Sequence, residues 1–161
     1  MTTGNNYEIV WSIHKVIITE SNIKSDANKI IRDIKEKIVE SFICNMYKEK
    51  KKIAYIKGKV DHETHSVFIS LLYVRKPYRN LGMGKTLMYS VIEKYGEKNN
   101  IFLTALIIDN QHEDETNKEN VNYNEENLKL VSFYEKLGFE ITTRNNESEN
   151  EFSYSMMRRN K

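Results

Sequence analysis

A basic segment with two closely spaced glycines contains the residue types that can bind a phosphate. It reads Arg75-Lys76-Pro77-Tyr78-Arg79-Asn80-Leu81-Gly82-Met83-Gly84-Lys85-Thr86. An apolar segment, Val67 to Val74, precedes it, and an amphipathic pattern follows from Leu87. A strand that passes through such a turn into a helix points several backbone N–H groups and the positive end of the helix dipole at one spot. Phosphates bind at such spots, so we expect an anion-binding cradle at residues 79–86.

The cradle has the form R-x-x-G-x-G, with Arg79, Gly82 and Gly84 at the named positions. Glycines let the backbone approach a phosphate, and Arg79 and Lys85 add positive charge. The ending Gly84-Lys85-Thr86 is similar to that of a P-loop, but a P-loop needs a glycine where Arg79 stands. A nucleoside triphosphatase is therefore disfavoured. An ordinary basic turn before a helix explains the pattern in isolation equally well.

The N-terminal third predicts strands and one helix. Residues 7–19 are rich in β-branched and aromatic side chains and predict a first strand with an irregular middle. From Asp26 to about residue 40, apolar side chains fall at helical spacing, with Ser25 as the N-cap, so we expect a helix there. Residues 42–47 and 52–60 alternate about the polar turn 48–51, which predicts a β-hairpin.

The middle of the chain predicts a strand, a helix and another strand. Residues 67–74 are apolar on both faces, which is typical of a central strand covered on both sides. A helix is expected from Gly84 to about Tyr95, and a buried strand over residues 101–108. Such a succession predicts a parallel crossover unit.

The C-terminal part begins with an acidic segment, residues 111–126, which contains six acidic side chains and one lysine. A loop this long in a compact domain is usually functional or disordered. A helix is expected from Leu128 to Leu137, followed by a terminal hairpin of residues 139–143 and 152–157 around the turn 144–151.

Two segments resemble the signatures of the GCN5-related N-acetyltransferase (GNAT) family. Leu71-Leu72-Tyr73-Val74, followed by Pro77-Tyr78-Arg79-Asn80-Leu81-Gly82-Met83-Gly84, looks like the acetyl-CoA signature of that family. Asn127, followed by Phe133-Tyr134-Glu135-Lys136-Leu137-Gly138-Phe139, is similar to its N…lYeklGF segment. The two signatures stand in the right order, separated by a helix and a strand. The resemblance covers residues 42–158.

The resemblance implies an N-acetyltransferase that uses acetyl-CoA as cosubstrate and no metal, and that transfers acetyl by direct attack of a primary amine in a ternary complex. It also implies the fold. We expect an α/β protein in which residues 1–161 form a single GNAT-like domain. Its sheet should be mixed and mostly antiparallel, with about six or seven strands flanked by helices.

The resemblance further implies a role for each matching residue. The backbone of residues 72–74 pairs with the pantetheine arm, in a strand that usually bulges and splays from the strand at 101–108. A backbone N–H there polarises the thioester oxygen, and the amides of residues 80–85 hold the pyrophosphate. Tyr134 lies beside the thioester sulfur as the catalytic residue. The expected cofactor-binding residues are Leu72, Tyr73, Val74, Arg79, Asn80, Leu81, Gly82, Met83, Gly84, Lys85, Thr86, Asn127 and Tyr134.

The spacing of Tyr134 alone favours a core residue, and the flanking motif favours a role next to the sulfur. A phenol with a pKa of ~10 is a weaker acid than a thiol with a pKa of ~8.5, so Tyr134 should act mainly by hydrogen-bonding the developing thiolate. An amine with a pKa of ~10.4 must also lose a proton before it attacks. Several family members have a glutamate on the central strand for this step, but residues 66–74 contain no acid. The base stays unassigned, because a surface role explains each candidate better: Glu63, His65, His112, Glu113 and Asp114.

The composition limits the compartment and the partners. The 25 basic and 23 acidic residues nearly balance, so no general nucleic-acid surface is expected. Cys44 is the single cysteine, which fits a reducing compartment, and its alternation with neighbouring apolar residues predicts that it is packed in a sheet face. No apolar run is long enough to span a membrane. We therefore expect an intracellular, cytoplasmic monomer or homodimer. The spacing of His62-Glu63-Thr64-His65 does not fit a zinc site.

The acceptor is not readable from the sequence. The acidic segment favours a cationic acceptor, such as a protein lysine, a protein N-terminus or a polyamine, and a disordered insertion explains it equally well. Two other functions remain open. One is a non-catalytic acyl-CoA-binding module, which the missing acid on the central strand favours. The other is a phosphate- or nucleic-acid-binding protein that uses the basic cradle.

Overall fold

The computed structural model describes residues 6–26, 29–106, 123–148 and 151–160. Within these residues the chain has seven strands and two α-helices, and it divides into two compact units between Lys94 and Tyr95. The predicted α/β class, with six or seven mostly antiparallel strands, is confirmed. That residues 1–161 form one domain stays a prediction. Neither described helix has the length and apolar character needed to cross a membrane.

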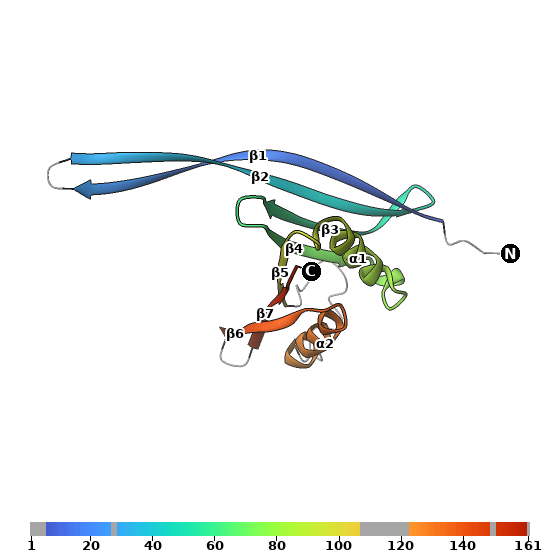
Figure 1. Ribbon diagram of the computed structural model, residues 1–161. Helices are drawn as coiled ribbons and strands as arrows, with labels where there is room; N and C mark the ends of the chain where they lie inside the picture. The colour runs from blue at the N-terminus through green and yellow to red at the C-terminus, as the bar shows by residue number, and fades with distance from the viewer. Residues whose placement is uncertain (1–5, 27–28, 107–122, 149–150, 161) are drawn as a thin grey trace. The chain divides into compact units, whose positions relative to one another are not determined.

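The first unit contains four strands in the order β1 (Tyr7–Asp26), β2 (Lys29–Lys48), β3 (Lys51–Asp61) and β4 (Ser66–Val74). Each pairs antiparallel with the next. The pairing of β1 with β2 runs from Tyr7 opposite Lys48 to Asp26 opposite Lys29, whereas β2 pairs with β3 only from Val39 onward. The remainder of β1 and β2 therefore continues past β3 as a two-stranded ribbon (Figure 1).

The helix predicted from Asp26 to about residue 40 is wrong, because these residues belong to the β1–β2 hairpin. Ser25, the expected N-cap, is the strand partner of Ile30. Isoleucines at residues 30, 34 and 38 are four apart, which is a helical spacing but also an even number, so it places them on one face of a strand as well. The β-branched side chains favour the strand, and the long partner in β1 satisfies its backbone.

The predicted hairpin of β2 and β3 is confirmed. Its turn residues, Glu49 and Lys50, both have positive φ angles, of 52° and 65°, as in the tight turns that match the twist of a hairpin. The ladder then contains an irregularity, because Tyr47 pairs with Lys52 while Met46 pairs with Ala54. The extra residue between them is Ile53, which forms a β-bulge and whose carbonyl accepts a hydrogen bond of 2.9 Å from the N–H of Arg75.

A second bulge lies in β4. Lys57 pairs with Leu71 and Gly58 with Ile69, which leaves Ser70 as the extra residue. The ring of Phe42, the β2 partner of Gly58, covers this glycine. β4 is less covered than its apolar sequence predicted, since Phe68 is 47% exposed. The expectation that both faces of this strand are buried is therefore wrong at this position.

Helix α1 (Met83–Tyr95) follows β4 and a short 3-10 turn. Leu87, Met88 and Val91 on one side of α1 are fully buried, and Nζ of Lys94 lies 5.2 Å from the centroid of the Trp11 ring on β1. Cys44 is buried as predicted, and burial raises the pKa of its thiol to about 11. The thiol therefore stays protonated near neutral pH, and Cys44 is a packing residue.

The second unit contains β5 (Asn100–Ala105), α2 (Tyr123–Glu135), β6 (Glu140–Ser148) and β7 (Glu151–Arg158). Its strand order is β5-β7-β6, with antiparallel pairing throughout. The terminal hairpin is confirmed, but its strands extend into residues 144–148, which were expected to be a turn. Residues 107–122 lie outside the described residues. The last part of the expected acidic loop, residues 123–126, is the first turn of α2.

Two asparagines hold α2 against β7. Asn124 Oδ1 accepts a hydrogen bond of 3.1 Å from the N–H of Phe152, and Nδ2 of Asn127 donates one of 2.9 Å to the Phe152 carbonyl. The two asparagines are three residues apart, so they lie on one face of the helix. The two side chains together hydrogen-bond both the N–H and the carbonyl of Phe152.

Replacing Asn127 by alanine should destabilise the protein by about 1–3 kcal/mol, because the half-buried Phe152 carbonyl loses its donor. Asn127 is only 1% exposed, so water cannot readily take its place. Urea unfolding of the variant measures the loss, and Ser132→Ala on the exposed side of α2 is the control. Equal midpoints for the two variants would contradict this role.

Replacing Gly58 by alanine should cost about 1–3 kcal/mol through overpacking. A Cβ at this position would lie 2.3 Å from the Phe68 carbonyl oxygen and 2.8 Å from Cζ of Phe42, so the backbone itself must move. Thermal and urea unfolding should show the loss, while Lys59→Ala at the exposed next residue should have little effect. An unchanged unfolding midpoint for Gly58→Ala would refute the close packing.

Candidate functional site

The turn between β4 and α1 forms the predicted cradle. Asn80 and Gly82 have positive φ angles of 62° and 85°, which bend the chain sharply on either side of Leu81. The first backbone hydrogen bond of α1 runs from Thr86 N–H to the Gly82 carbonyl, at 3.0 Å. The N–H groups of residues 83–85 precede this bond, so the helix provides no acceptor for them. Among the described residues, no atom lies within 4 Å of a Cβ built on Gly82, so this part of the structure leaves open space beside these groups.

Arg79 fixes this turn to the end of β4. Its Nε donates a hydrogen bond of 2.8 Å to the Val74 carbonyl, and its Cζ lies 5.9 Å from the centroid of the Tyr73 ring. Lys85 extends along α1, with Nζ 5.8 Å from the centroid of the Tyr89 ring one turn later. Arg79 therefore borders the cradle and also has a structural role that the sequence did not reveal, whereas the Lys85 amine lies toward Tyr89, away from the turn.

The predicted residues of β4 lie directly before the cradle. Leu72, Tyr73 and Val74 are half-buried, and their strand partners are Ile56, Tyr55 and Ala54. The bulge at Ser70 immediately precedes them, so the irregularity that the family resemblance implied for this strand is present. The structure thus brings together all the predicted cofactor-binding residues between Leu72 and Thr86 in the first unit.

The other two predicted residues, Asn127 and Tyr134, lie seven residues apart on α2 in the second unit. The amide of Asn127 is used to hold β7, as described above. The Asn-x-x-Asn spacing at residues 124–127 was the available signal for this role, but its partner on β7 is distant in the sequence. A contact between Asn127 and a cofactor stays a prediction.

Tyr134 is packed among aromatic side chains. It is 7% exposed, and its ring makes edge contacts with Phe133 and Phe139 at centroid distances of 5.1 and 5.8 Å. Burial raises the pKa of the Tyr134 hydroxyl to about 12. Among the described residues no hydrogen bond of this hydroxyl is present. The ring is therefore a core element, and its hydroxyl remains protonated at any physiological pH.

The candidate bases that the structure describes lie on the turn after β3. Glu63 donates its N–H to Asp61 Oδ1 at 3.0 Å, and His65 is exposed with a positive φ of 53°. Both residues therefore lie in a surface turn, as the sequence analysis expected for these candidates. The candidates at residues 112–114 lie outside the described residues. Within the described part of the chain, no group of three His, Cys, Asp or Glu side chains is placed to hold a metal ion.

Solved structures of acetyltransferases have a similar fold. Naa50 from Arabidopsis thaliana, in complex with the bisubstrate analogue CoA-Ac-MVNAL, is 23% identical, with a TM-score of 0.52 over 72% of this chain and 71% of that one. A Bacillus anthracis protein in complex with acetyl coenzyme A is 18% identical, with a TM-score of 0.59 over 99% of this chain and 100% of that one. An aminoglycoside 6′-N-acetyltransferase complexed with coenzyme A is 17% identical, with a TM-score of 0.53 over 73% and 72% of the two chains.

A comparison with curated protein sequences finds no match. A family model does match, however, and its description is "Acetyltransferase (GNAT) domain". The match extends over residues 40–141, which is more than half of the chain and includes β4, the cradle and α2. The chain therefore belongs to the GNAT acetyltransferase family.

Proposed function

We propose that this protein transfers the acetyl group of acetyl-CoA to a primary amine, by direct attack of the amine in a ternary complex. The observation that carries the proposal is the cradle, with its unpaired N–H groups and the open space at Gly82. Acetyl-CoA supplies an activated thioester: the new N–C bond forms as the C–S bond breaks, and the amine proton balances the released thiolate.

The residues of the cradle fit the diphosphate of acetyl-CoA. The N–H groups of residues 83–85 lie at the positive end of the α1 dipole, where an anion is stabilised. Arg79 borders the same turn and adds charge, and Lys85 belongs to the first turn of α1. The backbone of residues 72–74 would hold the pantetheine arm, and an N–H there would polarise the thioester oxygen. The structurally similar proteins named above with CoA or acetyl-CoA support the same ligand.

Tyr134 would assist departure of the thiolate without losing its proton. With a pKa of about 12, its phenol is a much weaker acid than a thiol. Against a thiol pKa of ~8.5, full proton transfer is uphill by roughly 5 kcal/mol. A hydrogen bond from the phenol to the developing thiolate has no such cost and becomes stronger as charge develops on sulfur. Tyr134 therefore acts as a hydrogen-bond donor.

A second candidate function is a non-catalytic acyl-CoA-binding module. The absence of an acidic residue from β4, residues 66–74, favours it, because no described side chain on this strand can remove the amine proton. The predicted preference for a cationic acceptor rests on residues 111–126, most of which lie outside the described residues, and it stays a prediction.

Thiol release from acetyl-CoA across a panel of amines tests the function. Gly84→Trp should abolish both turnover and CoA binding, because the indole would fill the cradle at the start of α1. Glu93→Trp is the control, since it places the same indole side chain at an exposed position about 13 Å further along α1. CoA binding without turnover on any amine would support the module instead. Intact CoA affinity in Gly84→Trp would show that the ligand binds elsewhere.

Tyr134→Phe should lower kcat by about 10- to 100-fold, the loss expected for one hydrogen bond to a charged group, and leave the KM for acetyl-CoA nearly unchanged. Because the pKa of Tyr134 is about 12, wild-type kcat should show no decline from its ionisation below about pH 11. Steady-state kinetics across pH measure both effects. Tyr154→Phe, a half-buried tyrosine on β7, is the control. An unchanged kcat would return Tyr134 to a purely structural role.

A further inference from the structure

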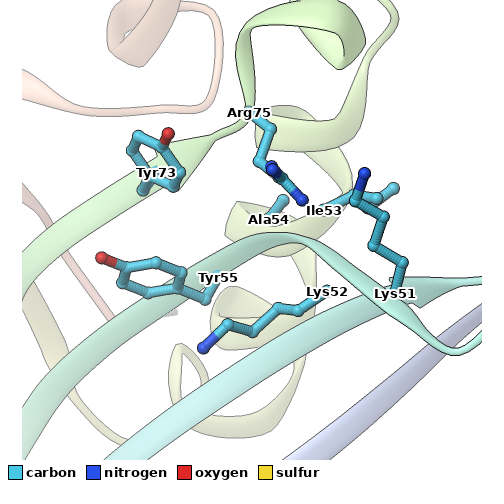
Figure 2. Close-up of a pocket in the computed structure, with 7 residues that line it drawn as sticks. All are labelled: Lys51, Lys52, Ile53, Ala54, Tyr55, Tyr73 and Arg75. Carbon is cyan, nitrogen blue, oxygen red and sulfur yellow. The ribbon is translucent and has the colours of Figure 1, made fainter. Parts of the chain in front are cut away.

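A pocket of about 370 Å³ lies where the bulge at Ile53 meets the end of β4. Figure 2 shows its two parts. Tyr55 and Tyr73 lie one above the other at one end, with Lys52 beside them, and Lys51 and Arg75 lie at the other end near Ile53. All of these residues belong to the first unit.

The lining contains three cations and no carboxylate. Among the described residues, none of Lys51, Lys52 and Arg75 is paired with an acidic side chain. The turn beside them has one residue of each sign, Glu49 and Lys50, so the positive charge of the lining is not cancelled there. A concave surface with several unpaired cations attracts an anionic ligand and can bind it through charge-assisted hydrogen bonds.

The two tyrosines give the pocket a flat apolar part. Their ring centroids are 5.5 Å apart with an interplanar angle of 38°, and they are direct cross-strand partners. Nζ of Lys52 lies 5.1 Å from the Tyr55 centroid. The bulge at Ile53 turns the start of β3 and brings its lysines toward the end of β4, where the Ile53 carbonyl accepts a hydrogen bond from the Arg75 N–H.

The volume of the pocket is within the range of small-molecule sites and larger than one phosphate group needs.

We propose that this pocket selects the acceptor, and that the acceptor is an amine that also has a carboxylate or phosphate group and a flat apolar portion. The proposal rests on the proposed acetyl transfer. The anionic group would bind Lys51 and Arg75, and the apolar portion would lie against Tyr55 and Tyr73. Tyr73 joins the pocket to the cradle, because the Arg79 guanidinium lies over the same ring. The acceptor pocket and the cofactor cradle thus share one strand end.

Binding of 3-phenylpropionate tests the pocket without any acetyl transfer. This probe combines an aromatic ring with a carboxylate, and 3-phenylpropanamide is its uncharged counterpart. By isothermal titration the acid should bind at least about tenfold more tightly than the amide, the ratio expected for one charge-assisted contact. The double variant Lys51→Gln/Arg75→Gln should remove this preference, and Lys59→Gln, an exposed lysine of β3 outside the pocket, should retain it. An equal affinity for acid and amide in the wild type, or an unchanged preference in the double variant, would overturn the proposal.

Two further measurements show whether the anion in the pocket belongs to the acceptor or to the cofactor. They also distinguish a failure of the pocket proposal from a failure of the proposed acetyl transfer. The kcat/KM for L-phenylalanine should exceed that for L-phenylalaninamide, and the double variant should remove the difference. If the double variant instead changes only the affinity ratio of CoA to 3′-dephospho-CoA, the pocket binds a cofactor phosphate and the acceptor assignment is wrong. If 3-phenylpropionate binds as expected but no amine is acetylated, the binding site stands and the proposed acetyl transfer fails.

Discussion

The first turn of α1 has N–H groups that the helix cannot pair, and the first unit is arranged so that an outside acceptor can reach them. Gly82 contributes the carbonyl that begins the helix, and no atoms fill the space where its side chain would be. Arg79 holds the turn by its hydrogen bond to the last residue of β4. A sharper turn before α1 would bury the N–H donors of its first turn, and a looser one would leave these donors hydrogen-bonded to water. The site therefore depends on a backbone shape more than on any single side chain.

Helix α2 carries both a residue that supports the fold and the tyrosine of the proposed reaction. Asn127 and Tyr134 lie on one face, and both are almost completely buried. Burial makes the asparagine effective at holding β7, because a buried amide pairs only with the protein. The same burial raises the pKa of Tyr134, since a phenolate is poorly solvated among aromatic rings. A tyrosine in this environment can donate a hydrogen bond but rarely releases its proton. Its chemistry is therefore decided by its packing.

The sequence predicted the elements that have a local signature. It did not predict the elements whose structure depends on pairing with residues far away in the chain. The turn before α1 and helix α2 each combine a glycine with a periodic apolar pattern, and both elements were predicted, although α2 begins at Tyr123, before the expected Leu128. The ribbon was not, because isoleucines four residues apart fit a helix and a strand alike. Only the distant partner in β1 distinguishes the two. The amide contacts of α2 with Phe152 and the pocket at Ile53 were missed for the same reason, since each joins residues that are far apart in the chain.

The bulge at Ser70 has a consequence for how this chain can change in length. Successive side chains of a strand alternate between its faces, so removal of one residue reverses every residue beyond it. Ser70 is the exception, because residues 69 and 71 already pair with the adjacent residues Gly58 and Lys57, so its deletion would make the ladder with β3 regular without turning residues 71–74 over. Insertions can accumulate at the tips of the hairpins, whereas in β4 Ser70 is the residue whose loss does not reverse the faces of the residues that follow.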